Sequence, residues 1–166
     1  MFDAARAALL YRFPVDRLVL RFKACGDFAA GRWLAGELAR ATRHLDAPDL
    51  LVAPPLAASR LRERGFNQAL ELARAVGRAR GIRVEARAVV KARETPLQAS
   101  LDRRARLANL RDVFEVRAAV AGLHVAIVDD VMTTAATAEA LAGALKQAGA
   151  ARVSAWVAAR TPDPRR

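Results

Sequence analysis

The sequence predicts an α/β protein in which a parallel sheet is flanked by helices. An apolar run at residues 124–128 is followed by a polar turn, a helix-periodic segment at 135–148 and a further apolar run at 152–159. Strands that alternate with helices in this way are typical of parallel sheets. Hydrophobic residues make up 54% of the chain but aromatic residues only 5%, so a core of Ala, Val and Leu is expected, which suits helices packed on a buried sheet.

A chain of 166 residues is long enough for one ordinary domain. We expect residues 1–45 to form a helical N-terminal segment packed on the core, and residues 46–161 to form the main domain. Every long apolar stretch is interrupted before it could cross a bilayer, and the first residues do not resemble a signal peptide. The sequence therefore predicts a cytoplasmic protein with no membrane insertion.

The N-terminal half contains several signals for element boundaries. Asp27 is a predicted N-cap for a helix whose apolar residues, Trp33 among them, recur at helical spacing. The apolar run at 49–53 ends at two prolines, as a buried strand does at its C-terminal end. Asn67 is expected to cap a further helix, which Gly81 ends.

The second half alternates short elements with polar segments. Residues 88–91 are a predicted strand, and residues 92–100 form a candidate mobile loop. A short Arg-rich helix is expected at 102–110, and residues 113–116 are expected to form a hairpin or edge strand. Trp156, like Trp33, lies in an apolar periodic segment and is expected in the core.

Charge points to an anionic partner. The net charge is +11, and residues 54–111 alone carry +9 from 14 basic and 5 acidic side chains. A positive region of this kind fits nucleic acid or a polyphosphate small molecule. The alternative is that arginine is simply a favoured residue here, because the chain has 25 Arg and 3 Lys. The lone Cys25 excludes an intrachain disulfide and gives no support for a zinc site.

Residues 128–137, with the sequence VDDVMTTAAT, join the strongest predicted strand to a helix. Free backbone N–H groups at a helix start, together with the hydroxyls of Thr133, Thr134 and Thr137, are donors that suit a phosphate. Asp129 and Asp130 suit ribose hydroxyls or a Mg²⁺ ion instead. The alternative is that these Asp and Thr residues only cap the helix.

This segment resembles the phosphoribosyl-pyrophosphate loop of type I phosphoribosyltransferases, whose fold is Rossmann-like. The resemblance implies that Asp129 and Asp130 bind the ribose hydroxyls, with Mg²⁺ accompanying phosphoribosyl pyrophosphate. It implies that the 5′-phosphate is bound by the residues that follow, which are Thr133, Thr134, Ala135, Ala136 and Thr137.

The loop differs from the family pattern at two positions. Ala135 stands where many members have Gly, so a positive φ there would be strained. Thr133 stands where purine-salvage members carry an acidic residue proposed as general base, so that proton transfer is not expected here.

Over most of its length the chain resembles the ComF family, which is linked with competence and DNA uptake. The strings that carry the resemblance are FKACGD at 22–27, VAPPL at 52–56, RGFNQ at 64–68, RETPLQ at 93–98 and RLAN at 106–109. ComF proteins often begin with a zinc ribbon of paired cysteines. This sequence has no such pairs, so no zinc is expected.

The resemblance also implies roles outside the loop. Pro54 and Pro55, with Asn67 and Gln68 nearby, would form the pyrophosphate-side loop, and residues 92–101 would correspond to the mobile hood. Four basic residues would neutralise the leaving pyrophosphate: Arg64, Lys91, Arg93 and Arg106. The alternative is that these four are solvated surface residues, that Asn67 is only a helix cap and that Gln68 is only a surface residue.

Two functions are compatible with these features of the sequence. The first is a phosphoribosyltransferase, a pentosyl glycosyltransferase that uses phosphoribosyl pyrophosphate and Mg²⁺ with an acceptor that the sequence does not identify. The second is a non-catalytic adaptor that binds a nucleotide or single-stranded DNA, or contacts competence proteins of the uptake machinery. Single-strand binders combine basic residues with aromatic stacking platforms, and only Phe66 lies in the basic region.

Overall fold

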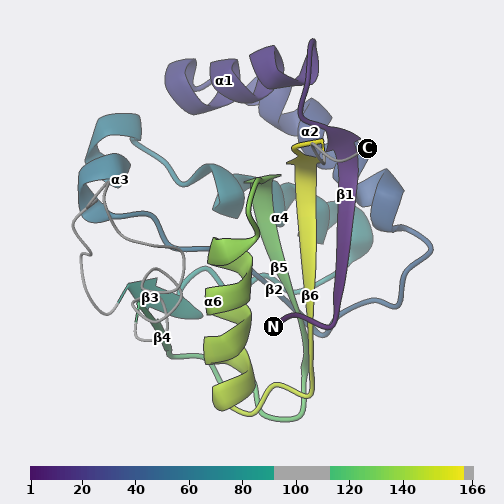
Figure 1. Ribbon diagram of the computed structural model, residues 1–166, viewed down its shortest axis with the longest axis vertical. Coiled ribbons are helices and arrows are strands. Elements are labelled where there is room, and N and C mark those ends of the chain that lie inside the picture. Colours follow the sequence, from purple (N-terminus) through teal and green to yellow (C-terminus); the bar gives the residue numbers. More distant parts are fainter. Residues whose placement is uncertain (92–112, 163–166) are drawn as a thin grey trace.

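A four-stranded parallel sheet forms the centre of the protein (Figure 1). The computed structural model describes residues 1–91 and 113–162. The strands are β1 (Ala4–Leu10), β2 (Leu50–Val52), β5 (His124–Met132) and β6 (Arg152–Arg160), in the order β1-β6-β5-β2. The expectation of a parallel sheet flanked by helices is confirmed.

Helices cover one face of the sheet as a layer. They are α1 (Val15–Cys25), α2 (Phe28–Thr42) and α4 (Gln68–Arg80), and their apolar residues form one core with Leu51, Val128 and Trp156. The expected caps are present. The carboxylate of Asp27 accepts from the N–H groups of Ala29 and Ala30 at the start of α2, and the Asn67 side chain accepts from Leu70 N–H in α4.

The other face is covered by α6 (Ala136–Gln147) and by a separate two-stranded antiparallel sheet of β3 (Val89–Lys91) and β4 (Phe114–Val116). Apolar residues of these elements form a second core with Val125, Ile127 and Val153 of the central sheet. The expected strand or hairpin at 113–116 is therefore confirmed as the antiparallel partner of β3. Helix α3 (Ala58–Arg64) lies beyond β2 and contributes no buried residue.

The expectation of an entirely helical segment at residues 1–45 is wrong for residues 4–10. These residues form β1, which pairs in parallel with β6 from Ala4 opposite Ser154 to Leu10 opposite Arg160. Their Ala, Leu and Arg side chains favour a helix, but edge pairing with a nine-residue strand overrides this weak local preference. The division of the chain at residue 45 stays a prediction.

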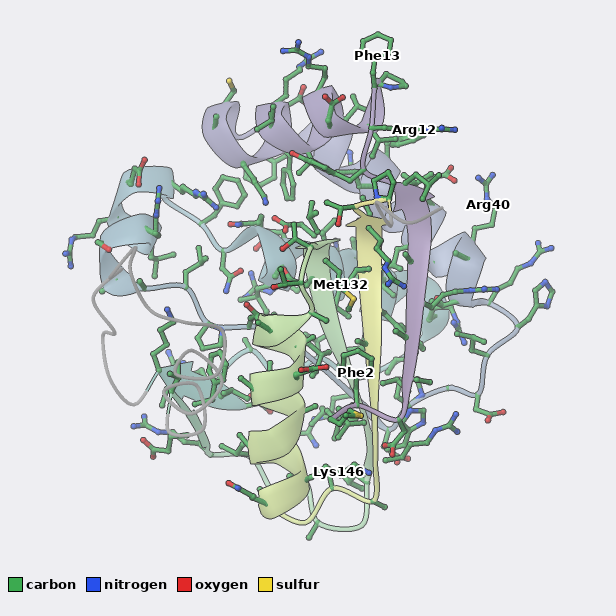
Figure 2. All side chains as sticks on the ribbon, viewed as in Figure 1. Phe2, Arg12, Phe13, Arg40, Met132 and Lys146 are labelled. Carbon is green, nitrogen blue, oxygen red and sulfur yellow. The ribbon has the colours of Figure 1, made fainter. Side chains whose placement is uncertain are left out.

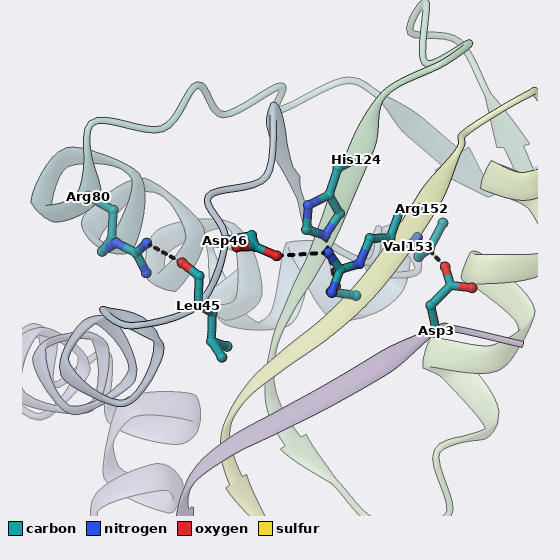
Figure 3. Close-up of polar contacts among 8 residues, drawn as sticks. Asp3, Leu45, Asp46, Arg80, His124, Arg152 and Val153 are labelled. Atoms are coloured by element: carbon teal, nitrogen blue, oxygen red, sulfur yellow. Dashed lines mark hydrogen bonds and ion pairs between the residues drawn. The ribbon is translucent and has the colours of Figure 1, made fainter.

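Polar contacts close the amino-terminal edge of the sheet (Figure 3). Arg152 pairs with Asp46 at 3.2 Å, and the Asp3 carboxylate accepts from Val153 N–H at 2.7 Å. His124 Nε2 lies 2.8 Å from the Ser154 hydroxyl, and burial is the main reason that the pKa of His124 is lowered. Structural contacts thus occupy this edge at β5 and β6, and ligands of open parallel sheets usually bind at the opposite, carboxyl edge.

Of the two tryptophans that are expected in the core, only one is buried. Trp156 is 2% exposed, as expected for a core residue, but Trp33 is 44% exposed. The expectation that Trp33 lies in the core is wrong. The next two residues of α2, Leu34 and Ala35, are buried, so Trp33 lies at the border of the buried face of the helix. Phe13, which projects from the turn before α1, is 78% exposed (Figure 2).

Among the described residues, no helix has both the length and the apolar character needed to span a lipid bilayer.

Candidate ribose-phosphate site

The candidate site is the carboxyl end of β5 and the turn that leads into α6. The sequence predicts that the strand ends at Val128, but β5 continues to Met132 because β6 pairs with it from Asp129 opposite Val157 to Met132 opposite Arg160. Met132 lies where β5 ends, beside the first turn of α6 (Figure 2). The expectation of a polar turn from residue 129 is therefore wrong, since Asp129 and Asp130 belong to the strand.

The two carboxylates are held in place by the backbone that follows them. Asp129 Oδ1 accepts from Asp130 N–H at 2.8 Å, and Asp130 Oδ1 accepts from Val131 N–H at 2.6 Å. Asp130 is only 4% exposed, so its side chain does not face solvent as a turn residue would. The strand pairing of β2 with β5 stops at Val52 opposite Ile127, so β5 has β6 alone as a partner from this point on.

Burial and mutual repulsion dominate the electrostatics of this pair. Desolvation, followed by the negative charge of Asp130, raises the pKa of Asp129 to about 7. Lys23 of α1 offsets part of this repulsion, because its ammonium lies 3.1 Å from Asp130 Oδ2. This contact is an ion pair without hydrogen-bond geometry, and Oδ2 of Asp130 accepts no hydrogen bond among the described residues.

The turn after β5 forms a small hollow of about 50 Å³. Its walls include the five predicted phosphate-binding residues together with the carboxylate of Asp129. These five are Thr133, Thr134, Ala135, Ala136 and Thr137. The hydroxyl-bearing residues Thr133, Thr134 and Thr137 are exposed, and α6 begins at Ala136 with its first N–H groups at this hollow. Hydroxyls and free N–H groups together are the donors that an anion requires.

Ala135 adopts the left-handed conformation that its place in the family pattern predicts. Its φ is 60° and its ψ is 0°, and among the described residues it is the only non-glycine with a positive φ. The left-handed region costs an L-residue about 1–2 kcal/mol, which glycine avoids. The turn is therefore strained at the residue that precedes α6.

The two prolines follow β2, which is the strand next to β5 and parallel to it, so both loops leave the same edge of the sheet. Asn67 Nδ2 donates to the Pro54 carbonyl at 3.0 Å, so Asn67 is more than a helix cap because it fixes this loop to α4. Gln68 is 6% exposed and its Oε1 has no partner among the described residues. The alternative that Gln68 is a surface residue is wrong.

The basic candidates are less well defined. Arg64 ends α3, and Lys91 ends β3 as an exposed residue. Neither forms an ion pair with a described residue, and neither contacts Asp129 or Asp130. Arg93 and Arg106, together with the predicted hood at 92–101 and helix at 102–110, lie outside the described residues. Their roles stay predictions.

Two contributions to this region come from α1 and α2 and were not predicted from the sequence. Lys23 belongs to the string FKACGD, whose spacing gives no sign of a charge pair, and its ion pair with Asp130 joins residues more than 100 positions apart. Phe28, at the start of α2, is 48% exposed and lies 5.1 Å from Phe66, measured between ring centroids. Phe66 is therefore joined by a second aromatic side chain.

A larger hollow of about 730 Å³ lies away from these residues, between the segment before β3 and the segment after β4. Its arginines include Arg83 and Arg117, which pair with Glu85 at 3.0 Å and Glu115 at 3.1 Å respectively. Because two of its three arginines are paired with neighbouring carboxylates, this hollow is a weaker candidate for an anion than the turn after β5.

Comparison with known proteins identifies relatives of this chain. DNA utilization protein YhgH from Salmonella typhimurium is 36% identical over 157 residues, which cover 91% of this chain and 69% of that protein. Competence protein F from Haemophilus influenzae is 30% identical over 159 residues, covering 90% and 69% respectively. No protein-family model matches the chain.

Among solved structures, adenine phosphoribosyltransferase from Thermoanaerobacter pseudethanolicus aligns with a TM-score of 0.54 at 17% identity. The alignment covers 82% of this chain and 84% of that one. At this level of identity the likeness concerns the fold alone, which is that of the type I phosphoribosyltransferases.

Substituting Ala135 tests the strain in the turn. Ala135→Gly is expected to raise the free energy of unfolding by about 0.5–1 kcal/mol, because relief of the left-handed conformation exceeds the entropy that glycine adds to the unfolded chain. Urea denaturation measures the change. Ala136→Gly is the matched control and is expected to lower stability, because Ala136 lies in the regular helix. A loss of stability in both variants would contradict the strain.

The raised pKa of Asp129 has a consequence for stability. The unfolded chain has the ordinary Asp pKa near 3.8, so the charged carboxylate disfavours folding increasingly as the pH rises from about 4 to about 7. Asp129→Asn is therefore expected to stabilise the protein by up to about 4 kcal/mol at pH 8, because each unit of the rise in pKa corresponds to about 1.4 kcal/mol, with the gain vanishing near pH 4.

Denaturant titration at the two pH values measures this difference. Glu63→Gln is the control, since the side chain of Glu63 is 63% exposed and its removal should have no such pH dependence. Equal effects of Asp129→Asn at both pH values would contradict the assigned cause.

Proposed function

Because the chain belongs to the family of DNA utilization protein YhgH and competence protein F, we propose that it binds phosphoribosyl pyrophosphate or a related ribose phosphate through residues 128–137, in the service of DNA uptake. The observation that carries the proposal is a pair of adjacent carboxylates at the end of a central parallel strand, followed by a hydroxyl-rich helix start. The fold of the type I phosphoribosyltransferases supports it.

In this proposal the sugar and the phosphate are bound by different chemical groups. Asp129 and Asp130 accept hydrogen bonds from the ribose hydroxyls through their carboxylate oxygens. The 5′-phosphate lies at the start of α6, where the hydroxyls of Thr133, Thr134 and Thr137 donate to it and the helix dipole favours its negative charge.

Lys23 has a separate role, which is to compensate the charge of Asp130. Its ammonium lies 3.1 Å from Oδ2 and places a positive charge beside this buried carboxylate.

Magnesium fits this site only together with the ligand. Among the described residues no three His, Cys, Asp or Glu side chains are grouped so that they could hold a metal ion. Two carboxylates completed by phosphate oxygens and water are nonetheless a usual donor set for Mg²⁺. Asp129 and Asp130 would hold the ion, which when bound neutralises charge on the pyrophosphate.

We propose transferase chemistry as the leading form of this function. A nucleophile on the acceptor forms a bond to the anomeric carbon while the bond to pyrophosphate breaks, and pyrophosphate leaves with the bonding electron pair. Arg64 and Lys91, with Arg93 and Arg106, are the proposed groups that stabilise the leaving charge. Pro54, Pro55, Asn67 and Gln68 belong to the loop on the pyrophosphate side.

A non-catalytic adaptor that binds a nucleotide or single-stranded DNA is the second candidate function. The charge of +9 on residues 54–111 favours it, as does the exposed pair of Phe28 and Phe66. Binding to single-stranded DNA would weaken steeply with salt and would survive Asp130→Ala, whereas turnover would release pyrophosphate and require Asp130.

The loop assignment is tested by Asp129→Asn combined with Asp130→Asn. Calorimetric titration with phosphoribosyl pyrophosphate, with and without Mg²⁺, is expected to show binding by the native protein and at least a tenfold loss in the double variant, because amides hold a ribose diol and Mg²⁺ less well than carboxylates. Glu37→Gln with Glu63→Gln is the control for the change in net charge. Unchanged affinity in the Asp variant would refute the assignment.

A further inference from the structure

A lysine of α1 lies against the more buried of the two adjacent carboxylates. Lys23 Nζ is 3.1 Å from Asp130 Oδ2, and the two side chains are 26% and 6% exposed respectively. Among the described residues, no other cation pairs with Asp129 or Asp130. Water screens this ion pair less than it screens the pairs on the surface, so the charge of Lys23 acts strongly on Asp130.

The backbone leaves one oxygen of Asp130 for another partner. Oδ1 of Asp130 accepts from Val131 N–H at 2.6 Å, whereas Oδ2 is buried and accepts no hydrogen bond among the described residues. Buried charged atoms usually have a partner, and the partner of this oxygen is the ammonium of Lys23. Oδ2 is therefore the oxygen of Asp130 that is open to a cation, and a cation of the protein already lies beside it.

The packing of α1 fixes the position of this lysine. Phe22, the preceding residue, is 1% exposed and belongs to the same core as Val128. Side chains two apart on a strand point to the same face, so Asp130 faces α1 as Val128 does. A Cβ atom on Gly31 of α2 would lie 2.6 Å from the Phe22 ring, so the glycine allows the two helices to pack this closely. Lys23 thus stands on a well-packed helix.

An ammonium group and a divalent cation compete for the same carboxylate oxygen. Both are positive, and their repulsion at contact distance lowers the affinity of the second cation by more than tenfold at the effective dielectric constant of a protein. Mg²⁺ also gives up its bound water reluctantly and requires several oxygen ligands in return. A carboxylate that is already paired with Lys23 therefore binds free Mg²⁺ poorly.

We propose that Lys23 is a built-in counter-cation that excludes free Mg²⁺ from Asp130 and admits the ion only together with a phosphate ligand. This inference rests on the proposed function and adds a requirement to it, namely that the metal and the ligand arrive together. Phosphate oxygens supply the further ligands and the negative charge that the ion needs in order to displace the ammonium. Lys23 is accordingly a positioning residue that acts through Asp130.

Metal binding in the absence of ligand tests the exclusion. MgCl₂ is titrated into the full chain by calorimetry at pH 8, with the ionic strength held constant by NaCl. The native protein is expected to show no saturable binding up to about 10 mM. Lys23→Met keeps the length of the side chain but removes its charge, and is expected to bind Mg²⁺ at least tenfold more tightly. Adding Asp130→Asn to this variant is expected to abolish the gain.

Two further variants separate the charge of Lys23 from general effects. Lys23→Arg retains a positive charge beside Asp130 and is expected to exclude Mg²⁺ as the native protein does. Arg17→Met removes a charge from an exposed position of the same helix, where Arg17 has no ion pair with a described residue. This control is expected to leave Mg²⁺ binding unchanged.

Thermal unfolding gives a second measurement for a variant that is less stable, because removing one partner of a buried ion pair is destabilising. An ion that binds only the folded protein raises the Tm. About 10 mM MgCl₂ is therefore expected to raise the Tm of Lys23→Met and to leave the Tm of the native protein unchanged, relative to NaCl at the same ionic strength.

The outcomes separate this inference from the proposed function, because the metal titrations contain no ribose phosphate. Tight binding of Mg²⁺ by the native protein alone, or no gain in Lys23→Met by either measurement, would overturn the role of Lys23 even if phosphoribosyl pyrophosphate binds. A gain in Lys23→Met supports the exclusion of free Mg²⁺, and a failure of phosphoribosyl pyrophosphate to bind would then refute only the proposed ligand.

Discussion

Asp129 and Asp130 lie side by side at the end of a central strand, and the second is almost fully buried. Two neighbouring carboxylates in such a place repel each other and lose hydration, which is why the pKa of Asp129 is raised to about 7. The surrounding structure compensates this cost. Backbone N–H groups of Asp130 and Val131 donate to the carboxylates, and α1 brings the ammonium of Lys23 to within 3.1 Å.

This electrostatic constraint explains why the N-terminal segment matters for a site whose motif lies near the C-terminus. β1 anchors the chain on the far side of β6, and α1 then crosses to the carboxyl edge of the sheet (Figure 1). Phe22, the residue before Lys23 in α1, packs against Phe28 and Phe66. One corner of the fold therefore supplies both the counter-charge for the carboxylates and an aromatic surface.

The elements that could be predicted from the sequence are those with strong local signals. Residues 124–160 form a strand, a helix and a strand, and their sequence shows apolar runs for the strands and helical periodicity for the helix. Asp27 and Asn67 are residue types that favour the N-cap position, and their side chains accept hydrogen bonds from the first backbone N–H groups of α2 and α4. β1 could not be predicted, because AARAALL favours a helix locally and becomes a strand only through its pairing with β6. The outward orientation of Trp33 differs from that of Leu34 by a single helical position, which periodicity alone does not resolve.

The residues of the candidate site likewise differ in how far the sequence predicts them. The contiguous motif at 128–137 identified the carboxylates, the hydroxyls and even the left-handed conformation of Ala135, since all of these are local. Lys23 lies about 100 residues away, and only the folded chain brings it to the motif. Its contribution depends on tertiary packing, for which the sequence contains no spacing rule.

The proposed function depends above all on a ligand site at the carboxyl end of β5 and the start of α6. The most direct test is to follow the backbone amide resonances of the isotopically labelled protein during titration with ribose 5-phosphate. The largest shifts are expected at residues 129–138 and around Lys23. Shifts confined to the hollow lined by Arg83 and Arg117, or spread without preference over the basic surface, would contradict this site.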